Sequence, residues 1–196
     1  MIAIIDYGAG NLTSMVKAIQ HLERDCIVTS GADDVFRAEK LIIPGVGNFK
    51  ATLSLANGKL GDAVRGAIAA RKPLLGICLG LQWMFDGSDE ALELRGLGAF
   101  AGMCTRFSER VKSPHVGWNQ IEVKPHSRLL RGVPSGAYVY FTHSYRAPLC
   151  ADTAAICTHE ESFTAAAERD NLFGLQFHPE KSGDIGMTIL ENFCAL

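Results

Sequence analysis

The length and composition of the chain fit one globular unit. It has 196 residues, of which 47% are hydrophobic, and this is enough to bury a substantial core. Nineteen basic and 21 acidic residues give a formal charge of -2. The balance argues against a basic surface for nucleic acid and against an acidic tail, so small molecules or proteins are the expected partners.

The first residues and the cysteines indicate in which cellular compartment the protein is expected. The chain opens MIAIIDYG, which is typical of a strand and not of a charged leader or a long apolar span. Six cysteines are scattered without a CxxC pair, in a chain long enough to fold without disulfides. We therefore expect a cytoplasmic protein with reduced thiols. The spacing of His and Cys predicts no metal site.

The first half of the chain alternates strand and helix. Apolar residues at helical spacing follow Asn11, a suitable N-cap, and predict a helix that ends near residue 22. A second helix is expected over residues 59–71. Short apolar runs predict strands at residues 2–5, 26–30, 41–43 and 74–77. This order is typical of an open parallel sheet flanked by helices.

After residue 100 the pattern changes to closely spaced strands with turn residues between them, which predicts hairpins. A last helix is expected over residues 184–195. The expected strands are at residues 117–123, 137–142, 153–158, 162–167 and 172–177. The predicted fold class is α/β, with an open, mixed, mainly parallel sheet flanked by helices and antiparallel strands in the second half. Residues 1–196 are expected to form a single domain.

The stretch GICLGLQ, residues 76–82, has the form of a nucleophile elbow. A strand that ends in G-x-C-x-G before a helix permits a strained turn that exposes the central side chain, here the Cys78 thiol. The helix that begins at Leu79 places free backbone amides beside the sulfur, which favours the thiolate and could hold an oxyanion. The alternative is a buried structural cysteine at a tight turn, and a partner base must decide between them.

The candidate base lies in LQFHPEKSG, where His178 and Glu180 flank Pro179 at the end of an apolar strand. Residues i and i+2 of an extended chain point to the same side, so both side chains are expected to face one site. An imidazole can serve a thiolate as general base and acid, and a carboxylate can fix its tautomer. Either residue alone is more often structural or solvated. Their occurrence with the elbow favours a catalytic triad.

The loop PGVGNF, residues 44–49, follows the third predicted strand. Its glycines would let the backbone approach a ligand closely. Ligands of open parallel sheets bind beyond the carboxyl ends of the strands, so this loop and the elbow are expected to face each other. An ordinary turn is the alternative. A phosphate loop is disfavoured because no GKS or GKT follows.

Together these motifs resemble the class I (triad) glutamine amidotransferases, which have a flavodoxin-like fold. DYGAGNLTS, PGVGNF, GICLGLQ, HVGWN, YFTHSY and QFHPEKSG stand in the expected order along essentially the whole chain. GICLGLQ and FHPE mark the wider family. DYGAGNL, PGVG, HVGWN and HSY resemble the branch of glutaminase subunits that acts in histidine biosynthesis.

The resemblance implies that glutamine is hydrolysed to glutamate and ammonia without a cofactor. Cys78 would attack the side-chain amide and form a thioester, while His178 would protonate the leaving ammonia and then activate water. The oxyanion would be held by the Leu79 amide and by an amide near Val46 and Gly47, either directly or after a peptide flip.

The resemblance also implies a substrate pocket and a partner. Family positions that contact the substrate match Gln82, Glu90, Ser144 and Tyr145, although spacing alone would also fit Gln82 as a helix-surface residue. Ammonia would pass within a heterodimer to a (βα)8-barrel cyclase subunit. That subunit makes imidazole glycerol phosphate and an aminoimidazole carboxamide ribotide.

The residues that match the interface with the cyclase are Asn11, Trp118 and Lys181. Exposed aromatic and basic side chains are common anchors at interfaces, whereas Trp118 taken alone is more often a core residue.

Two alternatives stay open. The first is a sibling glutaminase that feeds another synthase, and the identity of the partner distinguishes it. The second is a flavodoxin-like redox or chaperone protein whose elbow cysteine is oxidised instead of acylated. Such a protein has no need of the FHPE carboxylate.

Overall fold

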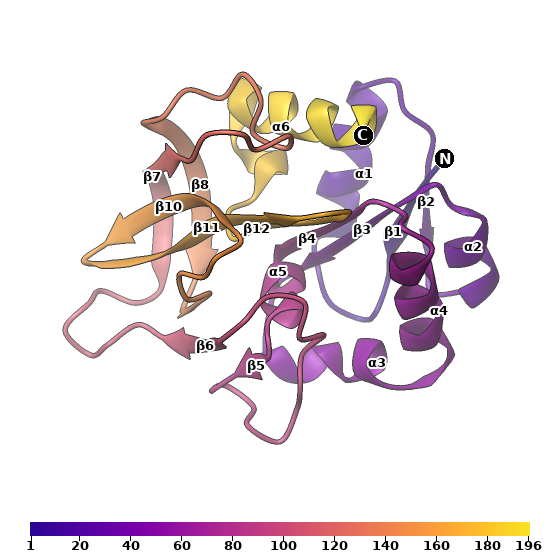
Figure 1. Cartoon of the computed structure of the whole chain (residues 1–196), viewed down its shortest axis with the longest axis horizontal. Coiled ribbons are helices and arrows are strands. Elements are labelled where there is room, and N and C mark those ends of the chain that lie inside the picture. The colour runs from indigo at the N-terminus through magenta and orange to yellow at the C-terminus, as the bar shows by residue number, and fades with distance from the viewer.

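The computed structural model describes residues 1–196 and has a central sheet of nine strands (Figure 1). In order across the sheet, the strands are β2 (Cys26–Thr29), β1 (Ile2–Ile5), β3 (Lys40–Gly45), β4 (Leu74–Cys78), β12 (Leu172–Leu175), β11 (Glu161–Arg169), β10 (Thr153–His159), β7 (His115–Val123) and β8 (Ala137–His143).

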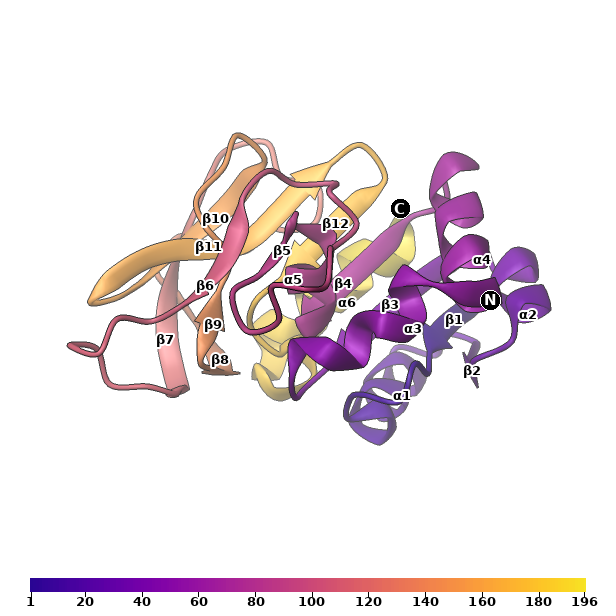
Figure 2. The ribbon, with the colours of Figure 1, turned by 90° about the horizontal axis from the view of Figure 1, so that it is seen from below.

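The sheet has a parallel half and an antiparallel half, which lie side by side in Figure 2. Neighbouring strands from β2 to β12 are parallel, and those from β12 to β8 are antiparallel. The predicted mixed sheet is therefore confirmed. Strand β12, which we expected in a hairpin, joins the two halves because it pairs with both β4 and β11.

Helices cover both faces of the parallel half. Helices α1 (Leu12–His21) and α6 (Gly183–Ala195) lie on one face, and α2 (Ala32–Arg37), α3 (Leu53–Ala56) and α4 (Gly58–Ala69) lie on the other (Figure 1). The remaining elements are α5 (Leu79–Met84), the 3-10 turns η1 (Phe49–Thr52) and η2 (Pro179–Lys181), and a small sheet of β5 (Gly87–Ser88), β6 (Met103–Arg106) and β9 (Tyr145–Arg146). None of the helices combines the length and the apolar character that a membrane crossing requires.

The short apolar runs form strands because both of their faces are buried. Side chains alternate along a strand, so Ile2 and Ile4 enter the core beneath α1 and α6, while Ala3 and Ile5 enter the core beneath α2 and α4. This explains why the runs are continuously apolar and why they resist assignment from periodicity alone.

The helices that were predicted are present to within a few residues. Asn11 is the N-cap of α1, and its Oδ1 accepts a hydrogen bond from the Ser14 amide at 3.4 Å. Helices α2 and α3 were not predicted. They have six and four residues, which is too short to show helical periodicity.

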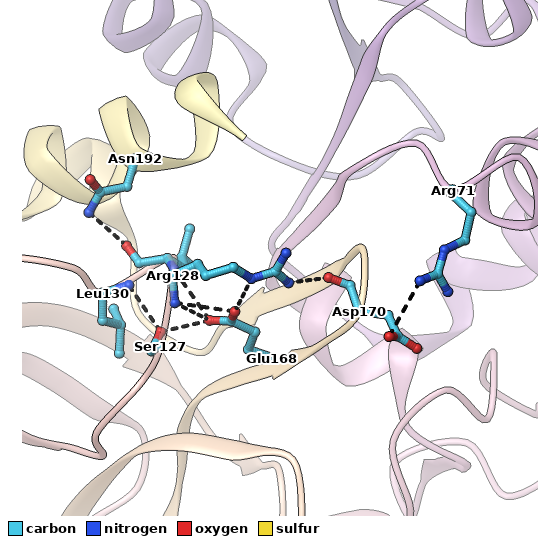
Figure 3. Close-up of polar contacts among 8 residues, drawn as sticks. Arg71, Ser127, Arg128, Leu130, Glu168, Asp170 and Asn192 are labelled. Carbon is cyan, nitrogen blue, oxygen red and sulfur yellow. Dashed lines mark hydrogen bonds and ion pairs between the residues drawn. The ribbon is translucent and has the colours of Figure 1, made fainter.

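Glu168 holds the loop before β8 against the sheet (Figure 3). Its side chain is 11% exposed and accepts hydrogen bonds from Ser127 Oγ at 2.7 Å and from the amide and Nε of Arg128 at 3.0 and 2.8 Å. Burial alone would raise the pKa of Glu168, but these bonds lower it. On the other side of the loop, Asn192 of α6 donates to the carbonyls of Leu129 and Arg131. The loop therefore joins β11 to α6.

Glu168→Gln should destabilise the fold by about 2 kcal/mol, because an amide replaces a charged acceptor whose neighbours are all donors. The measurement is the free energy of unfolding in urea at pH 7. Glu168 has a lowered pKa, so its carboxylate stabilises the fold above about pH 4 and ceases to do so as the pH falls further.

The difference in unfolding free energy between Glu168→Gln and the parent should therefore shrink at acid pH. Glu122→Gln, at an exposed position on β7, is the matched control and should change little. Equal stability of Glu168→Gln and the parent at pH 7 would contradict this account.

Candidate active site

Three adjacent parallel strands bring the sequence motifs to one edge of the sheet. PGVG closes β3, the elbow closes β4, and QFHPE follows β12. Gly45 pairs with Cys78 across β3 and β4, and Leu175 pairs with Ile77 across β12 and β4. The loop and the elbow thus lie side by side at the edge where we expected a ligand.

The elbow has a strained backbone. Cys78 has φ 53° and ψ -104°, a backbone conformation that residues with a Cβ rarely adopt. The flanking glycines are required by close contact. A Cβ on Gly80 would lie 1.9 Å from the Ile43 carbonyl oxygen, and a Cβ on Gly76 would lie 2.6 Å from the Gly80 oxygen. The two glycines let α5 pack directly against the sheet, and this packing holds the turn at Cys78.

The sulfur of Cys78 is almost buried, with 5% of the residue exposed. Its Sγ lies 3.9 Å from the carbonyl oxygen of Thr142, to which the thiol can donate. The side-chain amide of Gln176 donates to Sγ at 3.7 Å. Gln176 was not among the predicted site residues, because its partner lies 98 residues away in the chain.

His178 and Glu180 form a buried pair. His178 Nδ1 lies 2.8 Å from Glu180 Oε1, and the two side chains are 2% and 4% exposed. Burial alone would lower the pKa of His178, but interaction with Cys78 and Glu180 raises it to about 9. The other ring nitrogen, Nε2, is buried without a hydrogen-bond partner and is therefore free to exchange a proton.

The reason that we gave for this pairing is wrong. We expected an extended chain around Pro179, but Pro179–Lys181 is the 3-10 turn η2, with proline at its start. Proline suits the first residue of a helical turn because that position needs no N–H donor. Ser182 holds the turn, since its Oγ donates to the His178 carbonyl at 2.6 Å and accepts from the Tyr140 amide at 3.0 Å.

The PGVG loop presents exposed backbone to this site. Val46 and Gly47 are both exposed, and Gly47 has φ +112°. Glu90 accepts a hydrogen bond from the Phe49 amide at 2.7 Å, and burial raises its pKa. Glu90 therefore anchors the end of the loop in this structure.

Gln82 is not a helix-surface residue, because it is buried and 4% exposed. Its Nε2 donates to the Tyr145 carbonyl at 2.8 Å and to Gln176 Oε1 at 3.3 Å. Ser144 and Tyr145 are half-buried; Ser144 links β8 to β9, and Tyr145 begins β9 and pairs with Arg106 of β6. Gln82 and Tyr145 are thus in contact, whereas Ser144 makes its hydrogen bond through its carbonyl, to the Phe107 amide.

The motifs HVGWN and HSY meet in a chain of hydrogen bonds. His143 Nδ1 lies 2.9 Å from the Tyr145 carbonyl oxygen, which can only accept, so Nδ1 carries the proton and donates. In a neutral imidazole the other nitrogen is then an acceptor, so His143 Nε2 accepts from His115 Nδ1 at 3.2 Å. Asn119 Nδ2 then donates to His115 Nε2 at 3.3 Å. Burial lowers the pKa of His115 to about 4 and that of His143 to about 3, so both are neutral.

The predicted partner surface carries exposed aromatic and basic groups. Trp118 is 55% exposed and packs edge-on against Tyr140, with ring centroids 6.0 Å apart. Lys181 Nζ lies 5.8 Å from the centroid of the same tyrosine ring. Asn11 is exposed at the start of α1, a helix that contacts η2. Trp118 is therefore a surface residue and not part of the core.

Residues 3–196 match the family described as Glutamine amidotransferase class-I, and the chain belongs to this family. Solved structures of similar fold include a glutamine amidotransferase, with TM-score 0.77, 16% identity, and coverage of 99% of this chain and 100% of that one. Another is PurLQS from Thermotoga maritima, with TM-score 0.72, 17% identity, and coverage of 99% of this chain and 97% of that one.

Among curated relatives, the Imidazole glycerol phosphate synthase subunit HisH of Thermococcus kodakarensis is 44% identical over 199 residues and covers 98% of both chains. The Bacillus cereus protein of the same name is 40% identical over 195 residues, 98% of this chain and 93% of the relative. Within the amidotransferases, the chain belongs to this HisH group. The predicted family and branch are confirmed, and the redox alternative finds no support.

Gly80→Ala should destabilise the protein by about 3 kcal/mol, at the upper end of the usual cost of overpacking, because its Cβ would overlap the Ile43 carbonyl. The measurement is the free energy of unfolding in urea. Gly66→Ala is the matched control, since Gly66 is exposed within α4 and a Cβ there meets nothing within 4 Å. It should stabilise the protein by up to about 1 kcal/mol. Similar effects of the two substitutions would contradict the contact at the elbow.

Proposed function

We propose that this chain is a glutaminase subunit of imidazole glycerol phosphate synthase. It hydrolyses glutamine through a Cys78 thioester and passes ammonia to a cyclase subunit. The observation that carries the proposal is the strained elbow at Cys78 beside the buried His178 and Glu180 pair. The relatives named HisH support the choice of synthase.

The reaction begins with a protonated His178. Its pKa of about 9 keeps the imidazole charged at neutral pH, and this charge favours the thiolate of Cys78. The thiolate attacks the side-chain carbonyl carbon of glutamine and forms a tetrahedral intermediate. His178 then gives its proton to the leaving nitrogen, so that ammonia departs and a thioester remains.

Hydrolysis of the thioester uses the same groups, but His178 now accepts a proton instead of donating one. Neutral His178 takes a proton from water, and the resulting hydroxide attacks the thioester carbonyl. Glutamate leaves, and the thiolate and imidazolium return. Glu180, bonded to Nδ1 at 2.8 Å, keeps Nε2 directed at the reacting atoms and stabilises the imidazolium.

The oxyanion of both intermediates is assigned to the amide of Leu79 and an amide of the loop near Val46 and Gly47. The pairing of Gly45 with Cys78 supports this assignment, because it brings the loop beside the nucleophile. Each such donor typically contributes about 10²- to 10³-fold in rate.

The amino acid end of glutamine is assigned to a pocket formed by Gln82, Glu90, Ser144 and Tyr145. Gln82 is one helical turn beyond Cys78 and has an amide already held by the Tyr145 carbonyl. A rearrangement of Glu90 would also move the loop, since Glu90 accepts from the Phe49 amide.

The partner is a cyclase subunit, bound in a heterodimer at the face that carries Asn11, Trp118 and Lys181. The exposed Trp118 and the cation above Tyr140 support this face. The nine strands of the central sheet come from segments along most of the chain, the first being β1 and the last β12, so we treat residues 1–196 as a single domain. We place the reaction in the cytoplasm because it requires a reduced thiol at Cys78.

Cys78→Ala should abolish glutamine-dependent synthesis by the complex with the cyclase, to below about one thousandth of the parent rate. Synthesis from added ammonia should be retained, because the cyclase is unaltered. Glutamate release and imidazole glycerol phosphate formation are measured together.

Cys26→Ala, away from the site on β2, is the matched control and should retain both activities. Glutamate release that survives in Cys78→Ala would refute the assignment of the nucleophile. Normal hydrolysis with no response to the cyclase would point instead to a sibling synthase.

Glu180→Gln should lower kcat of the complex by about 10²- to 10⁴-fold, because the imidazolium loses its negative partner. Interaction with Cys78 and Glu180 raises the pKa of His178 against the effect of burial, so removing the charge of Glu180 should lower it. The imidazolium is then lost at a lower pH.

The alkaline limb of the pH profile of kcat should accordingly move to lower pH, whereas Glu191→Gln on the exposed face of α6 should leave it in place. An alkaline limb at the parent position in Glu180→Gln would argue that another group protonates the leaving ammonia.

A further inference from the structure

Gln176 is a fully buried glutamine that lies inside the site but has no part in the chemistry described above. It directly follows β12, is 0% exposed, and stands two residues before His178. Its backbone amide donates to the Ala165 carbonyl of β11 at 2.8 Å, so its position in the sheet is fixed. A polar side chain with no access to water needs a reason to be there.

The orientation of the Gln176 amide follows from its neighbours. Gln82 Nε2 lies 2.8 Å from the Tyr145 carbonyl, which can only accept, so this end of the Gln82 amide must be the nitrogen. The same nitrogen lies 3.3 Å from Gln176, which must therefore present its oxygen to Gln82. The Gln176 nitrogen is left to face Cys78, and it lies 3.7 Å from Sγ.

The two hydrogen bonds of the sulfur suit different states of Cys78. The Thr142 carbonyl, at 3.9 Å, can accept from the thiol but offers nothing to a thiolate. The Gln176 N–H, in contrast, donates, and its bond becomes stronger when the sulfur carries a negative charge. Gln176 therefore favours the reactive form of the nucleophile.

We propose that Gln176 is a catalytic residue whose Nε2–H stabilises the thiolate of Cys78, and that its amide links the nucleophile to Gln82. The link to substrate rests on the proposed function, in which Gln82 contacts glutamine. The donation to sulfur stands independently of it, because it depends only on the hydrogen bonds given above.

The first test is the alkylation of Cys78 by iodoacetamide as a function of pH, followed by mass spectrometry of the peptide that carries Cys78. Gln176→Met keeps the length of the side chain but removes the donor. The pH of half-maximal alkylation should rise by about one unit, the usual effect of one charge-assisted hydrogen bond. Gln20→Met, at an exposed position on α1, is the matched control and should not move it.

The second test is glutaminase activity in the complex with the cyclase. Gln176→Met should lower kcat by about ten- to a hundredfold with a smaller change in KM, because the lost bond acts on the nucleophile. Gln176→Asn provides a second variant, since it stays polar but is one methylene too short to reach Sγ. It should raise the alkylation midpoint in the same direction.

Gln176 would be a structural residue only if both variants keep the parent alkylation midpoint and kcat while the melting temperature falls, and that result overturns the proposal. If the variants raise the alkylation midpoint but the parent chain does not hydrolyse glutamine even with the cyclase, the role of Gln176 at the sulfur is supported and the proposed function is refuted. Failure of the Gln176 proposal is therefore distinguishable from failure of the proposed function.

Discussion

The parallel pairing of β3, β4 and β12 is the constraint on which the site depends. Gly45 of β3 is paired with Cys78 of β4. Leu175 of β12 is paired with Ile77 of β4, and Gln176 is the residue that follows Leu175. A shift of one residue in this register would send each side chain to the opposite face of the sheet and separate the nucleophile from its partners. The contact of Gly80 with the Ile43 carbonyl holds the elbow to the same register, since no larger residue lets α5 approach so closely.

Features that depend on neighbours in the chain could be predicted from the sequence. The apolar runs of the strands, the N-cap at Asn11 and the turn at Cys78 are local patterns, and the structure contains all three. The positions of Cys78, His178 and Glu180 could also be proposed, because a glycine-flanked cysteine and an FHPE sequence are unusual enough to stand out. The shape of the turn at Pro179 could not, since proline suits both an extended chain and the start of a helical turn.

Features that depend on partners far apart in the chain were missed. Gln176, Ser182 and Glu168 are polar residues whose significance comes from burial and from hydrogen bonds to segments about 40 to 100 residues away. Gln176 and Ser182 belong to the QFHPEKSG motif, but the motif alone gave neither residue a role, and Glu168 lies in no motif. Trp118 shows the opposite difficulty, because a large aromatic residue on a strand suggests the core although this one is exposed.

The place of β12 in the sheet affects how the chain folds as it is synthesised. Strand β4 has β3 on one side and β12 on the other, yet the whole of the segment from α5 to β11 lies between β4 and β12 along the chain. Until residues 172–175 leave the ribosome, the edge of β4 that β12 covers presents unpaired backbone N–H and C=O groups, and these can pair with another nascent chain. The open edge of β4 thus persists until late in translation, when most of the core residues are already made.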